Sequence, residues 1–175
     1  ANGDFAPGTP FWGIPVGLAG FYQTNPSICT DGAGGAIITW QDDRPPNLGT
    51  EDIYAQRVNA TGGVLWAGNG VPVCAWPGQQ IWPMLVADDT GGAIITWEET
   101  RPGGAFWDIY AQRVGGATGA IQWGGPGGVA ICTAPGGQWM PMIVGAGIGG
   151  AGGAIITWYD ARFDAGDIRA QRVSL

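Results

Sequence analysis

The stretch Gly34–Trp40, which reads GGAIITW, decides the fold because the sequence contains it three times. It returns without a change at residues 91–97 and 152–158, so that its closing tryptophans are 57 and 61 residues apart. A repeat of this length is typical of solenoids, propellers and arrays built from one recurring unit. The sequence therefore predicts three tandem copies of one structural unit.

A second repeated block follows each copy of the first. It reads DIYAQRV at Asp52–Val58 and at residues 108–114, and DIRAQRV at residues 167–173, where Arg169 replaces the tyrosine. Both blocks are rich in β-branched and aromatic residues, which favour strands. No stretch of useful length has the helical spacing of apolar residues. We therefore predict an all-β chain.

Each unit contains four predicted strands, of which the two repeated blocks are the last two. The second strand follows the proline of a Gln-x-x-Pro motif, at residues 27–30, 84–87 and 142–144. The first strand is a run led by tryptophan, at residues 64–74 and 120–132 and, in a shorter form, at 12–16. Glycine-rich turns join the second strand to the third, because such turns need positive φ.

Four strands in about 57 residues is the size of one propeller blade. We predict three tandem four-stranded propeller-type blades in one repeat domain, residues 11–175, after an N-terminal arm at residues 1–10. The units are assigned to residues 11–58, 63–114 and 118–173. The domain would begin on the outer strand of one blade and end on the third strand of another. Because propellers usually have about four to eight blades, we expect strand exchange between copies or ring closure to complete the ends.

The repeated motifs resemble the Asp-Ile-Tyr-Ala-Gln-Arg-Val type of repeat found in large secreted bacterial β-propeller-like proteins. The resemblance covers residues 11–175. It implies a β-propeller-like fold and an extracellular or cell-surface location. It implies no enzymatic chemistry.

The composition argues against several classes of function. The chain has 14 acidic residues and seven arginines, with no lysine and no histidine, and a net charge of −7. Binding to nucleic acid or to an anionic membrane needs a basic patch, and membrane insertion needs about 18 consecutive apolar residues, so none of these is expected. Without histidine, the commonest metal ligand, we expect no metal and no cofactor. Three cysteines are too few for a disulfide framework and are predicted to be buried thiols.

An acid and an arginine follow the motif tryptophan in every unit, and the acids are Asp42, Glu99 and Asp160. An aspartate then opens the next block, so each arginine is expected near two carboxylates, which suits its bidentate geometry. The group is either a ligand-binding or acid–base site, or an ion pair that fixes the long loop. Threefold repetition favours the structural role, since a catalytic pair is rarely copied into every repeat. The residues predicted to form these structural ion pairs are Arg44 and Asp52, Arg101 and Asp108, and Arg162 and Asp167.

Five aromatic residues outside the repeated blocks are the candidate contact residues: Tyr22, Trp76, Trp82, Trp107 and Trp139. They fall near the Gln-x-x-Pro motifs or in the long loops between the repeated blocks, and in a propeller these two sets of loops open onto the same face. An aromatic surface there would contact another subunit or stack sugar rings. The remaining interpretation is that these residues belong to the core.

We therefore expect a non-enzymatic, extracellular structural repeat protein that assembles with copies of itself, as a fibre or ring, through its complementary terminal strands. The alternative is a lectin-like carbohydrate-binding or adhesion module, with polysaccharide as its partner. Adjacent acids such as Glu98 and Glu99 resemble the paired carboxylates of a glycosidase. Acids side by side on one loop are more typical of solvated charge, so an enzyme is not expected.

Overall fold

The computed structural model describes residues 10, 12–46, 49–146, 152–163 and 166–175. Every regular element in these ranges is a β-strand, so the all-β prediction is confirmed. Accordingly, no helix in the described part of the chain has the length and apolar character needed to cross a membrane. The predicted N-terminal arm, residues 1–10, lies outside the described residues except for Pro10.

The eleven strands form three antiparallel sheets. The first sheet contains β1 (Gln23–Thr30), β2 (Ala36–Asp42), β3 (Asp52–Val58) and β4 (Val71–Cys74). The second contains β5 (Gln79–Ala87), β6 (Ala93–Thr100), β7 (Asp108–Val114) and β8 (Val129–Cys132). The third contains β9 (Gln138–Gly145), β10 (Ala154–Asp160) and β11 (Asp167–Val173).

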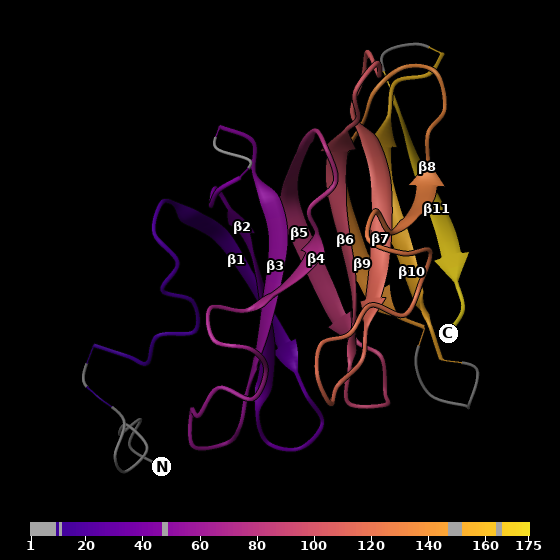
Figure 1. The fold of residues 1–175 in the computed structure, drawn as a ribbon. Coiled ribbons are helices and arrows are strands. Elements are labelled where there is room, and N and C mark those ends of the chain that lie inside the picture. The colour runs from indigo at the N-terminus through magenta and orange to yellow at the C-terminus, as the bar shows by residue number, and fades with distance from the viewer. Residues whose placement is uncertain (1–9, 11, 47–48, 147–151, 164–165) are drawn as a thin grey trace.

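The sheets stack side by side in chain order, and the described stack is open rather than closed into a ring (Figure 1). Strands that follow one another in sequence are neighbours in each sheet. The two repeated blocks pair in one register throughout, as in Ala36↔Val58 and Ala93↔Val114. Identical sequence therefore gives an identical ladder in each sheet.

The tryptophan-led strands are shorter than predicted. Only Val71–Cys74 and Val129–Cys132 form strands, at the outer edges of the first and second sheets, while Val64 and Ile121 each make an isolated bridge. The preceding residues turn instead, and both Asn69 and Gly70 have positive φ. The described residues 12–22 contain no strand, so the strand predicted at 12–16 is wrong for this chain on its own.

The innermost strands β1, β5 and β9 begin earlier than predicted, at or beside the glutamine of the Gln-x-x-Pro motif. Each contains a β-bulge at the motif. The residues before the three prolines have positive φ: Asn25, Trp82 and Met140. Proline is tolerated there because a bulge leaves one residue unpaired, so the missing backbone N–H of proline breaks no ladder hydrogen bond.

The core lies between the sheets rather than inside any one of them. One buried cluster joins the first and second sheets and contains Ile53 and Trp97. A second cluster joins the second and third sheets and contains Ile109, Ile156 and Trp158. Alternation along a strand sends neighbouring side chains to opposite faces, so the motif tryptophan of each later sheet points back to the sheet before it.

Candidate functional site

A tryptophan–carboxylate–arginine triplet follows the repeated motif in each sheet. In the first sheet the Trp40 indole Nε1 donates to Asp42 Oδ2 at 2.8 Å, and Arg44 Nε donates to Asp42 Oδ1 at 2.7 Å. Arg44 Nη2 also donates to the Asn69 carbonyl oxygen at 2.9 Å, in the turn before β4. The Asp42 carboxylate is buried with both oxygens bonded, so it fixes the loop and leaves no lone pair aimed at solvent for acid–base chemistry.

The arginines of the other two triplets likewise pair with the acid two residues before them. Arg101 Nε lies 2.5 Å from Glu99 Oε1, and Arg162 Nη2 lies 2.6 Å from Asp160 Oδ2. Glu99 is deeply buried, and that desolvation raises its pKa although Arg101 and the Trp97 indole oppose the effect. Hydrogen bonds from Arg162 instead hold the pKa of Asp160 well below its usual range, against the effect of burial.

The aspartates that open the next block act on the arginines from further away. Hydrogen bonding to Asp42 is the main cause that raises the pKa of Arg44, and the charge of Asp52 adds to it. Burial raises the pKa of Asp108, while the charge of Arg101 lowers it in part. Asp167 lies 3.0 Å from Arg169 Nη2. The predicted neighbourhood of one arginine and two acids is thus built around the earlier acid.

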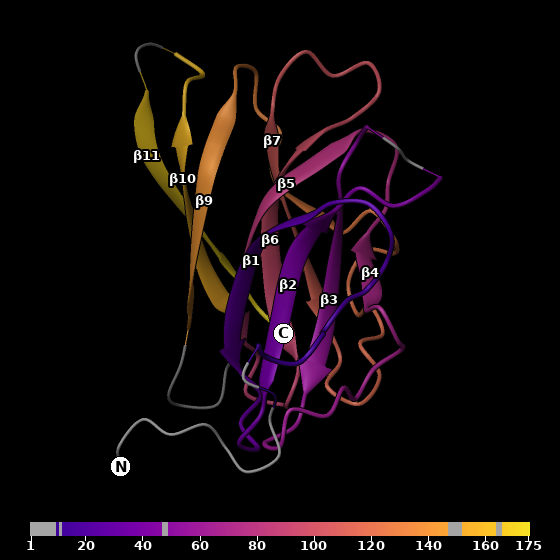
Figure 2. The same ribbon diagram turned by 90° about the vertical axis from the view of Figure 1, so that its left-hand side faces the viewer.

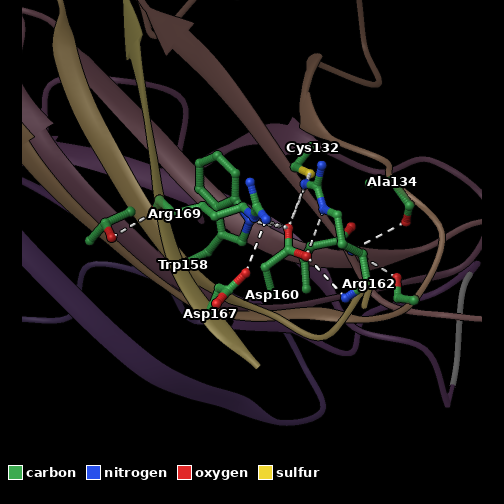
Figure 3. A network of polar contacts seen from close by, with 10 residues as sticks. Cys132, Ala134, Trp158, Asp160, Arg162, Asp167 and Arg169 are labelled. Atoms are coloured by element: carbon green, nitrogen blue, oxygen red, sulfur yellow. Dashed lines mark hydrogen bonds and ion pairs between the residues drawn. The ribbon is translucent and has the colours of Figure 1, made fainter. Parts of the chain in front are cut away.

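The third triplet differs from the first two (Figure 3). The guanidinium groups of Arg44 and Arg101 stack over the rings of Tyr54 and Tyr110, 3.7 and 3.9 Å from the ring centroids. In the third sheet Arg169 occupies the position of that tyrosine. Its Nε lies 3.8 Å from Asp160 Oδ2 and has no hydrogen-bond partner.

Arg162 also takes a different third partner. Its Nη2 lies 3.0 Å from Cys132 Sγ, as Figure 3 shows, where Arg44 and Arg101 reach a backbone carbonyl. Together with Arg169, it places two cations beside the single buried carboxylate of Asp160. The third site therefore holds one more cation than either of the other two.

Each outer strand covers the triplet of the following sheet. Cys74 Sγ of β4 lies 3.8 Å from Glu99 Oε2, and Cys132 Sγ of β8 lies 3.7 Å from Asp160 Oδ2. All three cysteines are free thiols. Burial, with the nearby charges of two aspartates, raises the pKa of Cys29 to about 11, so its reactive thiolate is scarce at neutral pH.

The three bulges line a cavity of about 880 Å³ at the inner edges of the sheets. Its wall includes Trp82, Trp139 and Tyr159, and the last two rings lie 5.7 Å apart between centroids. Two side chains link neighbouring sheets here. Gln41 Oε1 accepts from the Trp82 amide at 3.0 Å, and Glu98 Oε1 accepts from the Met140 amide at 2.7 Å.

Of the five predicted aromatic contact residues, only Trp82 and Trp139 line this cavity. Trp76 lies under the guanidinium of Arg101, at 5.5 Å from its ring centroid. The Trp107 carbonyl accepts from the Gln138 amide at 2.8 Å, which links the second and third sheets, and Tyr22 is exposed before β1. Glu98, which the sequence suggested as solvated charge, is buried instead, and burial raises its pKa.

The outer face of the third sheet is an apolar surface that the sequence reasoning missed. It exposes Met142, Val144, Ile155 and Ile168, on the side away from the second sheet. The interior equivalents of Ile168 are Ile53 and Ile109, and both are fully buried. Aligning the repeats and asking which face lacks a neighbour would have found it. The candidate functional site is this face together with the uncovered edge of β11.

Comparison with protein-family models, with curated proteins and with solved structures found no match to this chain. Among the described residues, no group of three or more Cys, Asp or Glu side chains is placed to hold a metal ion.

Proposed function

We propose that this protein is a non-enzymatic, extracellular structural repeat protein that assembles head to tail with copies of itself. One observation carries the proposal. Ile155 and Ile168 are 42% and 76% exposed in the third sheet, whereas the residues at their positions in the first two sheets are fully buried. The equivalent face of the first sheet packs against the second sheet, and that of the second packs against the third. In the third sheet this face is exposed.

The occupant that fits this face is the first sheet of a second copy. The outer face of the first sheet presents the exposed Ile28 and the half-buried Ile38, in the places of Leu85 and Ile95 in the second sheet, whereas Trp40, in the place of Trp97, is already buried within the chain. Those second-sheet residues are buried against the first sheet within the chain. The chain already contains two interfaces of this kind, between the first and second sheets and between the second and third. The outer faces of the third and first sheets correspond to the two sides of such an interface.

Burial of apolar area supplies the driving force. Covering one isoleucine side chain contributes about 1.5–3 kcal/mol, and exposed apolar patches usually mark interaction surfaces. Joining two different faces is a heterologous contact, which makes a ring if the rotation closes and a fibre if it does not. The extracellular setting rests on the resemblance to secreted β-propeller-like repeat proteins.

The test compares Ile168→Arg with Phe106→Arg, a matched control in which an exposed apolar residue of the loop between β6 and β7 is changed. Mass would be measured by sedimentation and native mass spectrometry, and shape by negative-stain microscopy. We expect wild type and the control to form particles larger than the monomer. Ile168→Arg should weaken association by about tenfold or more, since burying an unpaired charge costs over about 1.4 kcal/mol. A monomeric wild type at micromolar concentration would refute the proposal.

Carbohydrate binding is the second candidate, and the cavity at the bulges supports it. Trp82 is exposed there beside Trp139 and Tyr159, and such rings offer flat apolar faces. If wild type is monomeric and added polysaccharide changes its tryptophan fluorescence, this function becomes the better one. The variant Trp82→Ala should then reduce that change, while Trp12→Ala should leave it as it was.

A further inference from the structure

The segment Gly13–Gly17 has the sequence of a fourth strand. It reads GIPVG, against GVPVC at Gly70–Cys74 and GVAIC at Gly128–Cys132, the stretches that form β4 and β8 with the glycine before each. The opening glycine has a positive φ in all three: 84° at Gly13, 82° at Gly70 and 67° at Gly128. Glycine adopts this conformation readily and other residues do not. The segment thus has the entry turn of a fourth strand but pairs with no strand among the described residues.

The segment also lies where the fourth strand of a preceding sheet would lie. Gly17 is nine residues before Pro26, as Cys74 is before Pro83, and a Cβ on Gly17 would lie 3.0 Å from Cζ2 of Trp40. Cys74 covers the second triplet in the same way. Leu18 N donates to Asn69 Oδ1 at 2.9 Å, which anchors the chain on the first sheet. Figure 2, which looks onto that sheet, shows the segment running across it.

The third sheet has the complementary vacancy. β4 pairs with β3 and β8 pairs with β7, but no strand pairs with the outer edge of β11 among the described residues. Figure 1 places the segment before β1 and the strand β11 at opposite ends of the stack, so the two are not neighbours in one molecule. A free strand edge is a template for pairing with another chain.

The third triplet points to the same partner. Arg44 and Arg101 each donate to the carbonyl of the residue just before the opening glycine, Asn69 at 2.9 Å and Gly127 at 2.6 Å. The residue just before Gly13 is Trp12. A second copy that placed Gly13–Gly17 along β11 would bring the Trp12 carbonyl to Arg162. It would also cover part of the Trp12 side chain, which is 87% exposed in the single chain.

We infer that Gly13–Gly17 of a second copy pairs antiparallel with β11 and completes the third sheet as its fourth strand. The inference rests on the proposed self-assembly and specifies its contact. The register should copy β3 with β4, where Val71 is opposite Ala55 and Cys74 is opposite Ile53. Ile14 of the second copy then lies opposite Ala170, and its Gly17 lies opposite Ile168. Pro15 takes the place of Pro72, a position on an outer strand where proline is accepted.

The test uses two single variants, Ile14→Cys and Ala170→Cys, mixed in equal amounts and oxidised gently. A bond between them can form only between copies. The control mixture replaces Ala170→Cys by Arg169→Cys, because the side chain of residue 169 is on the opposite face of β11. Unmixed wild type measures the background from the native thiols. Gly17→Cys with Ile168→Cys is a second pair in the same register, used if Ile14→Cys disturbs folding.

We expect the matched pair to give at least about ten times more covalent dimer than the control, since a disulfide needs Cα atoms within roughly 7 Å. Assembly of the variants into large particles without this preference would refute the strand pairing and leave the proposed function standing. Monomeric particles throughout would refute both. Dimer from each single variant alone, at the level of the mixture, would also count against the assigned register.

Discussion

The repeated blocks have nearly the same sequence in the second and third sheets, but their surroundings differ. β6 and β10 share AIITW, and β7 and β11 differ in these seven residues only at Tyr110 and Arg169. Their ladders have the same register. Yet β7 is largely buried, whereas most of β11 is exposed. Local sequence decides how the strands pair, and the neighbouring sheet decides what each residue contributes to stability.

The difference follows from the order of the stack. The second sheet is covered on both faces, and the third on one face only. In a linear array of this kind, stability is roughly a sum of terms for each unit and for each interface between neighbours. Substituting the same repeat residue should therefore change the free energy of unfolding strongly in the second sheet and weakly on the outer face of the third. The predictions below use this contrast.

The largest expected effect is the contrast between Ile109→Ala and Ile168→Ala. Ile109 is fully buried between two sheets, so removing its side chain should lower the free energy of unfolding by about 2–5 kcal/mol. The same change at Ile168, exposed in the single chain, should alter it by less than about 0.5 kcal/mol. Urea unfolding of dilute, monomeric protein measures both. Equal losses would contradict the exposed position of Ile168 in the single chain.

The sequence predicts the strands made by the repeated blocks because their β-branched and aromatic residues act locally. It also predicts that the last unit ends on the third strand of its sheet, and the third sheet has three strands among the described residues, although the strand predicted at 12–16 does not form. The short length of β4 and the bulge at Trp82 were not predicted. The first depends on positive φ at Asn69 and Gly70, and the second on positive φ at Trp82 itself. The apolar outer face depends on which sheet stands next to which, and no single repeat contains that information.

A medium effect is expected in the pH dependence of stability, where Asp160 and Glu99 act in opposite directions. The pKa of Asp160 is lowered in the folded state, so its contribution is present above its ordinary pKa and is lost as pH falls through the folded value. The pKa of Glu99 is raised, so its contribution is present at low pH and is lost as pH rises through the folded value.

Matched amide variants test this contrast. Across pH 7 to pH 3, Asp160→Asn should make the loss of stability below about pH 4 shallower, and Glu99→Gln should remove the stabilisation that appears as pH falls toward about 4.5, each slope changing by at most about 1.4 kcal/mol per pH unit. Thermal or urea unfolding across this range gives the slopes. Two slopes that change in the same direction would show that the two triplets respond to protons alike, despite their different surroundings.

The smallest effect concerns the residue that the two sheets do not share. Arg169→Tyr would let Arg162 stack on a ring, as Arg101 does on Tyr110, and would remove a buried Nε that lacks a partner. It would also remove the contact with Asp167, an exposed pair worth about 0–1 kcal/mol. We expect a net gain of about 0.5–1 kcal/mol in the single chain.

The reciprocal change, Tyr110→Arg, is the comparison for Arg169→Tyr. It buries a second cation beside Arg101 in an enclosed site, so it should destabilise the second sheet by more than Arg169→Tyr stabilises the third. Urea unfolding of both variants decides the order. If Arg169→Tyr is instead destabilising, then Arg169 is fitted to the third sheet as it stands. If it stabilises the monomer but weakens the assembly, the arginine has been kept for the contact between copies, and the one departure from the repeat lies where the stack meets its neighbour.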